Sequence, residues 1–233
     1  MRSDAGASGG AAAAVVLLSA VVAILLTALF LILVQNAVPK ASGPVYALFP
    51  YDGEVVAIGL VGGVLPLVAS LAMLAAPARP RGDAERPPPF RSTAYWLAVL
   101  VITLFITLFF TASQALYGGL GLPREWAFWL LFAGCVAGVD YWWLRGRWLG
   151  VAWGAAECYV MGTIGAFGSD VIRTLTGLAR APGEAAVWGG GGLLDIVFWF
   201  GLYASLSFLS LWAVLALLTR ARNAMLHAGM PPG

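Results

Sequence analysis

The stretch Gly162–Asp170, GTIGAFGSD, and the stretch Gly189–Leu202, GGGGLLDIVFWFGL, carry the features around which this chain is organised. Each places one aspartate, Asp170 or Asp195, behind glycines and beside a long apolar segment. A charged side chain at the centre of a membrane helix costs about 2.5–3.5 kcal/mol on insertion scales, so a carboxylate there indicates function. The glycines leave room for another backbone or a substrate to approach.

The composition predicts an integral membrane protein. Of the 233 residues, 61% are apolar and only 10% are charged, whereas soluble domains are roughly 45–50% apolar and 25% charged. The net charge of +2 is small, and the arginines cluster at the ends of apolar runs, which argues against a nucleic-acid partner. We therefore expect an all-α, polytopic helix bundle whose main partner is the lipid bilayer.

Cysteine and histidine offer no material for a metal centre. Cys135 and Cys158 both fall inside apolar runs, and the one histidine, His227, lies in the polar tail. A cysteine in such a run usually behaves as a small hydrophobe. We expect no metal, no cofactor and no disulfide, so chemistry within the bilayer would rest on carboxylates, hydroxyls or backbone groups.

Apolar runs predict about six transmembrane helices within a single domain covering 1–233. The expected spans are residues 11–35, 55–76, 94–113, 126–143, 148–172 and 192–218. The first run is longer than the roughly 7–15 apolar residues of a secretory signal, so we interpret it as a retained span or a signal anchor. The sequence leaves open whether the connections 41–54 and 114–125 re-enter the membrane.

Basic residues set the expected orientation. With six spans, nine lysines and arginines fall on the side that holds both termini, and four fall on the other side. The positive-inside rule then places the N-terminus and the C-terminus in the cytoplasm of a multi-pass protein of the cell membrane. Asp170 and Asp195 would lie together near the outer edge of the hydrocarbon.

Two local patterns predict packing and hydrogen bonding. The fifth and sixth spans are joined by a short turn, and the fifth is rich in glycine, so we expect these helices to lie side by side. Thr103, Thr107 and Thr111 recur every four residues in the third span. They could line a polar seam, but hydroxyls that bond back to their own helix are the simpler interpretation.

A set of polar and small residues in the last two spans forms the candidate site. Glu157 lies well inside the fifth span, about 140° around the helix from Asp170, so the two acids occupy different faces. Thr163 shares a face with Asp170. The candidate ligands for a substrate or ion are Asp170, Asp195, Glu157, Thr163, Gly168 and Gly191.

The glycine and aspartate pattern resembles a known family. The runs Tyr159–Asp170 and Gly189–Gly201 are similar to the C-terminal signature of an uncharacterised prokaryotic membrane family, domain of unknown function 1614. Val61–Pro66 is a looser match that lacks the asparagine the family carries before its glycine pair. Ile196 follows Asp195 where the family has glycine. The resemblance implies membership of a membrane protein family and implies no activity.

The two aspartates are also distantly similar to those of presenilins and signal peptide peptidases, which carry one aspartate on each of two successive membrane helices. Two carboxylates held close cannot both ionise, so one acts as acid while the other activates water. The match is incomplete. No tyrosine directly precedes Asp170, and only one apolar segment follows Asp195, so Pro66 would have to supply the proline of those proteases from a distant segment.

Three interpretations remain open. The protein is a channel or transporter in which Asp170 and Asp195, with Glu157, bind a cation or proton; or it is an intramembrane aspartyl hydrolase that uses the two aspartates on a membrane peptide. In the third, it is a structural or accessory protein whose aspartates cap helices or pair with Arg173 or Arg180. The sequence identifies neither the substrate or ion nor the oligomeric state.

Overall fold

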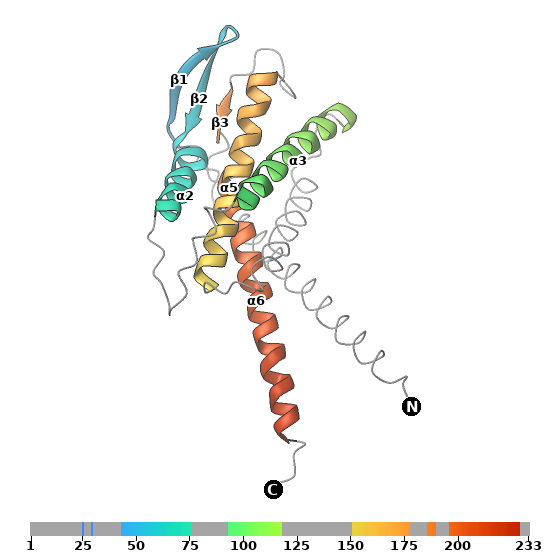
Figure 1. Cartoon of the computed structure of the whole chain (residues 1–233). Coiled ribbons are helices and arrows are strands. Elements are labelled where there is room, and N and C mark those ends of the chain that lie inside the picture. The colour runs from blue at the N-terminus through green and yellow to red at the C-terminus, as the bar shows by residue number, and fades with distance from the viewer. Residues whose placement is uncertain are drawn as a thin grey trace.

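The computed structural model describes residues 43–75, 93–117, 151–177, 186–189 and 196–228, together with Leu25 and Leu29, which are helical. Helices dominate these ranges: α2 (Leu65–Ala75), α3 (Thr93–Tyr117), α5 (Val151–Thr176) and α6 (Ile196–Ala228). The other elements are the strands β1 (Val45–Tyr51), β2 (Glu54–Gly59) and β3 (Val187–Trp188) and the π-helical turn η1 (Leu60–Val64). Figure 1 shows their arrangement.

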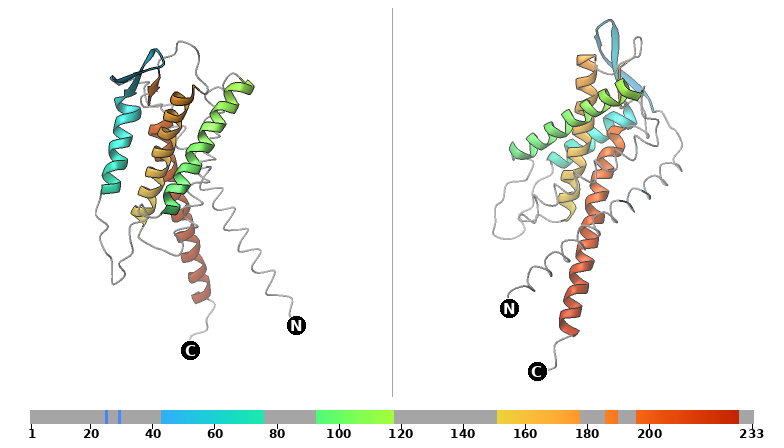
Figure 2. Two further views of the ribbon diagram at one scale, coloured as in Figure 1. Left: turned by 45° about the horizontal axis from the view of Figure 1, so that its top comes forward. Right: turned by 90° about the vertical axis from the view of Figure 1, so that its right-hand side faces the viewer.

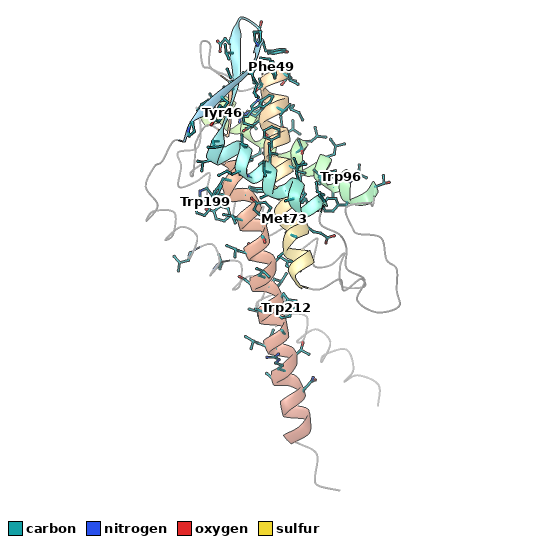
Figure 3. All side chains as sticks on the ribbon, turned by 90° about the vertical axis from the view of Figure 1, so that its left-hand side faces the viewer. Tyr46, Phe49, Met73, Trp96, Trp199 and Trp212 are labelled. Atoms are coloured by element: carbon teal, nitrogen blue, oxygen red, sulfur yellow. The ribbon has the colours of Figure 1, made fainter. Side chains whose placement is uncertain are left out.

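Helix α5 is the centre of the described structure. It packs against α6, α3 and α2, and the left view of Figure 2 shows it between α2 and α3. The buried core lies where α3, α5 and α6 meet, and its fully buried members are Ile106, Cys158, Val160, Ala166, Val197, Phe200 and Ala204. Figure 3 shows α6 continuing past the other helices, with Trp212 on the extended part.

Three predicted spans correspond to helices. Segment 94–113 is helical throughout as α3. Segments 148–172 and 192–218 are helical as α5 and α6, apart from short stretches at their starts that lie outside the described residues, and each of the three helices continues beyond its predicted end. Within the described ranges, one helical stretch, Val197–Ala221, is long and apolar enough to cross a membrane, with a mean hydropathy of 1.9. The span predicted at 126–143 lies outside the described residues, as does all of 11–35 except Leu25 and Leu29.

The expectation of an all-α fold is corrected by a three-stranded sheet of order β1-β2-β3. β1 and β2 form an antiparallel hairpin, with Leu48 as the extra residue of a bulge, and β2 pairs in parallel with β3. The turn residues Asp52 and Gly53 have φ values of 51° and 79°, the left-handed geometry that two-residue hairpins require. Residues 45–51 of the loop expected at 36–54 therefore form the first strand of a hairpin.

The predicted span 55–76 is also corrected, because it begins as strand β2 and becomes helical only at Leu60. Val55, Val56 and Ile58 are β-branched and suit a strand. In η1 the Leu65 N–H donates to the carbonyl of Leu60, five residues earlier. This wide turn leads into Pro66, which has no N–H to donate to the carbonyl four residues before it.

Candidate functional site

Helices α5 and α6 touch through glycine, which confirms the prediction that they lie side by side. A Cβ built on Gly162 would lie 3.0 Å from the Phe200 ring, and one built on Gly201 would overlap the hydroxyl oxygen of Thr163. Gly201 therefore lies directly against Thr163. The backbones approach closely because neither glycine carries a side chain.

A second glycine face of α5 meets α3. Added Cβ atoms on Gly165 and Gly168 would lie 2.8 Å from Ile102 Cγ2 and 2.9 Å from Thr103 Cγ2. Gly168, predicted as a ligand position, thus forms part of the helix contact. The Thr103 hydroxyl donates to the Val99 carbonyl at 2.9 Å.

The other two threonines of α3 behave in the same way. Thr107 donates to the carbonyl of Thr103 and Thr111 to that of Thr107, each at 2.8 Å. All three hydroxyls of the repeat thus bond back to their own helix, which confirms the simpler of the two interpretations of this pattern.

Glu157 is the most deeply placed acid among the described residues, with only 1% of its surface exposed. It lies on α5 next to Cys158, which is fully buried in the core. Its main-chain carbonyl accepts a hydrogen bond from the Tyr95 hydroxyl at 3.0 Å, which ties α3 to α5 at this level. Glu157 is therefore held among packed helices, where a charged carboxylate is costly.

Hydroxyl groups share the interior with Glu157. The buried serines and threonines among the described residues are Ser70, Thr103, Thr107, Thr163, Ser169, Thr174 and Ser207. Within the described residues, the hydroxyls of Ser70 and Ser169 make no hydrogen bond. Buried polar groups are normally paired, and these two hydroxyls are exceptions among the described residues.

Asp170 lies in the C-terminal part of α5, six residues before the last residue of the helix, Thr176. The helix had been predicted to end at Ile172 and continues beyond it. Its carboxylate is 4.0 Å from the Arg173 guanidinium, and these side chains are 18% and 21% exposed. A long, partly exposed pair of this kind contributes only a few tenths of a kcal/mol. The pair with Arg173 agrees with a structural role for Asp170, but so weak an interaction does not explain why an acid stands at this position.

Strand β3 is fastened to α5 beside Asp170. The Trp188 Nε1–H donates to the Thr174 hydroxyl at 2.9 Å, and that hydroxyl donates to the main-chain carbonyl of Asp170 at 2.9 Å. The Trp188 ring packs edge-on against Phe49 and Phe167, with centroid separations of 5.9 and 5.5 Å. The sequence analysis did not identify Trp188.

The hairpin is tied to the same end of α5. The Tyr51 hydroxyl donates to the main-chain carbonyl of Leu175 at 2.8 Å. Together with Trp188, this bond places the three-stranded sheet over the end of the helix that carries Asp170 (Figure 1).

Two glycine motifs far apart in sequence cross here. Gly189, with a φ of 67°, lies so close to Gly62 and Gly63 that an added Cβ would overlap their main chain. A Cβ on Gly63 would in turn lie 3.0 Å from the Trp188 carbonyl oxygen. At Gly189, the first residue of the glycine run before Asp195, the main chain of another segment therefore packs closely. The sequence suggested that the glycines leave room for either another backbone or a substrate, and at this residue the neighbour is a backbone.

The structure separates the predicted site residues. Along an α-helix with a rise of 1.5 Å per residue, Glu157 and Asp170 lie about 20 Å apart and Thr163 lies between them. They cannot bind one ion together. Asp195 and Gly191 lie outside the described residues. No group of three histidine, cysteine, aspartate or glutamate side chains suited to a metal ion occurs in the described ranges.

The chain matches no protein-family model, no curated protein and no solved structure. Its resemblance to the prokaryotic membrane family and to the presenilin type of protease stays a prediction. Inference about function therefore starts from the packed helices and from Glu157, the buried acid among the described residues.

Proposed function

We infer that this chain is a multi-pass protein of the cell membrane, with about six transmembrane helices and both termini in the cytoplasm. Within its helix bundle it binds a proton or a cation, as a channel or transporter. The burial of Glu157, 1% exposed on the central helix, carries this proposal. An acid buried in a membrane helix by default marks an ion or proton pathway.

The exposed surface of α3 supports placement in a membrane. Leu97, Val101 and Leu108 point outward and are 59%, 58% and 66% exposed, whereas Thr103 and Thr107 on the same helix point inward and are buried. A helix of a soluble protein has the reverse pattern, with apolar residues inside and polar residues outside. The inward side of α3 also carries the buried Ile102 and Ile106, so this helix is apolar on its outward side as well as in the core, which suits contact with lipid.

The interior chemistry supports a proton or a hard cation as the bound species. Carboxylate and hydroxyl oxygens are the ligands that such cations prefer, and a carboxylate also accepts a proton. Glu157 lies deep in the bundle, and Asp170 lies about 20 Å away near the outer end of the same helix. We assign Glu157 as the inner binding group and Asp170, with Asp195, as the group that the species meets first.

Flux measurements test this function. Purified protein in liposomes should move protons, Na⁺ or K⁺ down an imposed gradient, and Glu157→Gln should abolish that flux while Glu157→Asp retains part of it. Asp52→Asn, in the exposed hairpin turn, is the matched control and should leave flux unchanged. A folded Glu157→Gln protein with wild-type flux would contradict the proposal.

An intramembrane hydrolase is the second candidate, and one observation favours it. α6 begins at Ile196, directly after Asp195 in sequence, and packs along α5, which carries Asp170. Contact between the two segments is what a carboxylate dyad needs. Cleavage of transmembrane peptides in the same liposomes, lost in both Asp170→Asn and Asp195→Asn, would favour this candidate over transport.

A further inference from the structure

We propose that the β1–β2 hairpin lies in the headgroup region of the lipid bilayer and completes a membrane crossing of which η1 and α2 form the helical part. The proposal rests on the membrane location inferred above and goes beyond it, because it assigns a partner and a depth to a sheet that is not itself transmembrane. The interaction surface is the outer strand β1 together with the outward side of α2. Its partner is the phospholipid of one leaflet.

Strand β1 exposes apolar side chains on both of its faces. Val45 and Tyr46 are neighbours, so they point to opposite sides of the strand, and each is 50% exposed. Leu48 and Phe49 are also exposed. An antiparallel sheet in water normally presents one apolar face to a core and one polar face to solvent. A strand with apolar side chains open on both faces suits an environment that is itself partly apolar.

The free edge of β1 limits how deep the hairpin can lie. In the order β1-β2-β3, β1 is an edge strand. The backbone N–H and C=O groups along its outer edge do not pair with any of the described strands. Open sheet edges do not occur in the hydrocarbon, because each unpaired N–H or C=O costs several kcal/mol there. In the headgroup region, water and phospholipid esters satisfy such groups while the apolar side chains reach the acyl chains.

Charge marks which end of the hairpin faces water. Between Val45 and Ala75 the only charged residues are Asp52 and Glu54, and both lie at the turn. The turn is the part of the hairpin farthest from α2 (Figure 1). The surface from the hairpin base to the end of α2 therefore carries no charge that would have to be desolvated on contact with lipid.

The apolar surface continues from the hairpin along α2. Leu65, Val68 and Leu71 recur every three residues on this helix and are exposed. Figure 3 shows Tyr46 and Phe49 on the hairpin and Met73 toward the other end of α2, and the chain bends sharply where the two elements meet.

The dimensions fit this placement. The helical stretch Leu60–Ala75 is about 24 Å long at 1.5 Å per residue, which falls short of the hydrocarbon thickness of about 30 Å. The hairpin stands at a steep angle to α2 (Figure 2, left view), so its length is not added to that of the helix, and it meets the boundary of the hydrocarbon where the helical stretch begins.

Spin-label accessibility tests the proposal on the full chain in phosphatidylcholine nanodiscs. Single cysteines at Leu48, Asp52 and Val68, in a Cys135→Ala/Cys158→Ala background, would each carry a nitroxide. The depth of each nitroxide in the bilayer is measured from its collision rates with two reagents. Dioxygen concentrates in lipid, and a nickel chelate stays in water. We expect the label at 68 to favour dioxygen, the label at 52 to favour nickel, and the label at 48 to lie between them. Tyr46→Cys is a second reporter on the same strand.

The outcomes separate this proposal from the proposed function. A label at 48 as open to nickel as the label at 52 overturns the hairpin placement, while a lipid-exposed label at 68 still supports a membrane protein. Nickel access at both 48 and 68 overturns both proposals. Labels at 46 and 48 shielded from both reagents would show that protein covers the strand, and this also overturns the lipid assignment.

Discussion

Gly189 lies directly against the main chain of Gly63, so close that the Cβ of any other residue at 189 would overlap the Gly63 nitrogen. This contact joins the segment that leads toward α6 to the π-helical turn that opens α2. It is a structural reason for glycine at position 189, because the main chain of Gly63 occupies the space that a side chain would need. The same segment reaches α5 through Trp188.

Gly189→Ala should destabilise the protein strongly. The substitution adds about 1–2 kcal/mol for a left-handed backbone at a non-glycine residue and about 1–3 kcal/mol for overpacking, so we expect a loss of at least about 2 kcal/mol. The control is Gly53→Ala, which has a φ of 79° but no atom within 4 Å of the added carbon, and it should lose only about 1 kcal/mol. Unfolding in mixed micelles measures both. Equal losses would refute the close contact.

Gly201→Ala should loosen the contact between α5 and α6, and Thr163→Ala should partly restore it. The added methyl group would meet the Thr163 hydroxyl and would lie 2.9 Å from the Tyr159 carbonyl oxygen. Removing the hydroxyl relieves the first clash and leaves the second. A double-mutant cycle on unfolding free energies should therefore show that the double variant loses less than the sum of the single variants. Simple additivity would argue against the contact.

Trp188 should contribute through its hydrogen bond and its ring separately. Trp188→Phe removes the bond to Thr174 but keeps an aromatic ring beside Phe49 and Phe167, so the expected loss is about 1 kcal/mol. Trp188→Ala removes the ring contacts as well and should lose about 2–3 kcal/mol, because the residue is only partly buried. Urea or detergent unfolding of both variants distinguishes them. Identical losses would mean that the ring contributes nothing.

Asp170→Asn should separate stability from function. Its ion pair with Arg173 spans 4.0 Å at a partly exposed position, so its loss should change the unfolding free energy by less than about 1 kcal/mol. Flux should nevertheless fall, because asparagine cannot hold the charge that attracts a cation or accept the proton. Asp140→Asn should leave flux unchanged, because Asp140 is followed in the sequence by Tyr141, two tryptophans and Arg145, a pattern that predicts a position at the membrane interface. A folded Asp170→Asn protein with full flux would remove Asp170 from the pathway.

Several features of the fold could be predicted because they depend on local patterns. The contact between α5 and α6 follows from glycines in a helix next to a short connection, and the bonding of Thr103, Thr107 and Thr111 follows from their four-residue repeat. In both cases the determining interaction lies within one helix or between neighbours in sequence.

The hairpin was missed although it has a local signal. Asp52-Gly53 between apolar, β-branched and aromatic residues is a strong hairpin pattern, but hydropathy alone made Val55–Ala76 look like one continuous membrane helix. A short apolar run does not distinguish a strand from a helix. The pairing of β2 with β3 had no local signal, because these strands are far apart in sequence, with η1, α2, α3 and α5 among the described elements between them.

The candidate site was predicted only in part. Glu157 was named as a candidate, but its burial depends on how α3, α5 and α6 pack, which the sequence pattern does not determine. The distance between Glu157 and Asp170 along α5 excludes a shared ion. This agrees with the helical spacing, which predicted that the two acids occupy different faces. The pairing of Asp170 with Asp195 stays a prediction, since Asp195 lies outside the described residues.

The central claim is that the carboxylate of Glu157 binds the proton or cation. Infrared difference spectra of the reconstituted protein, recorded while the pH is lowered or a monovalent cation is added, measure this directly through the carbonyl band of a protonated carboxyl group. We predict a band that changes with these conditions, disappears in Glu157→Gln and remains in Asp170→Asn. Spectra of Glu157→Gln that superimpose on those of the wild type would show that this acid binds neither species and would contradict the account.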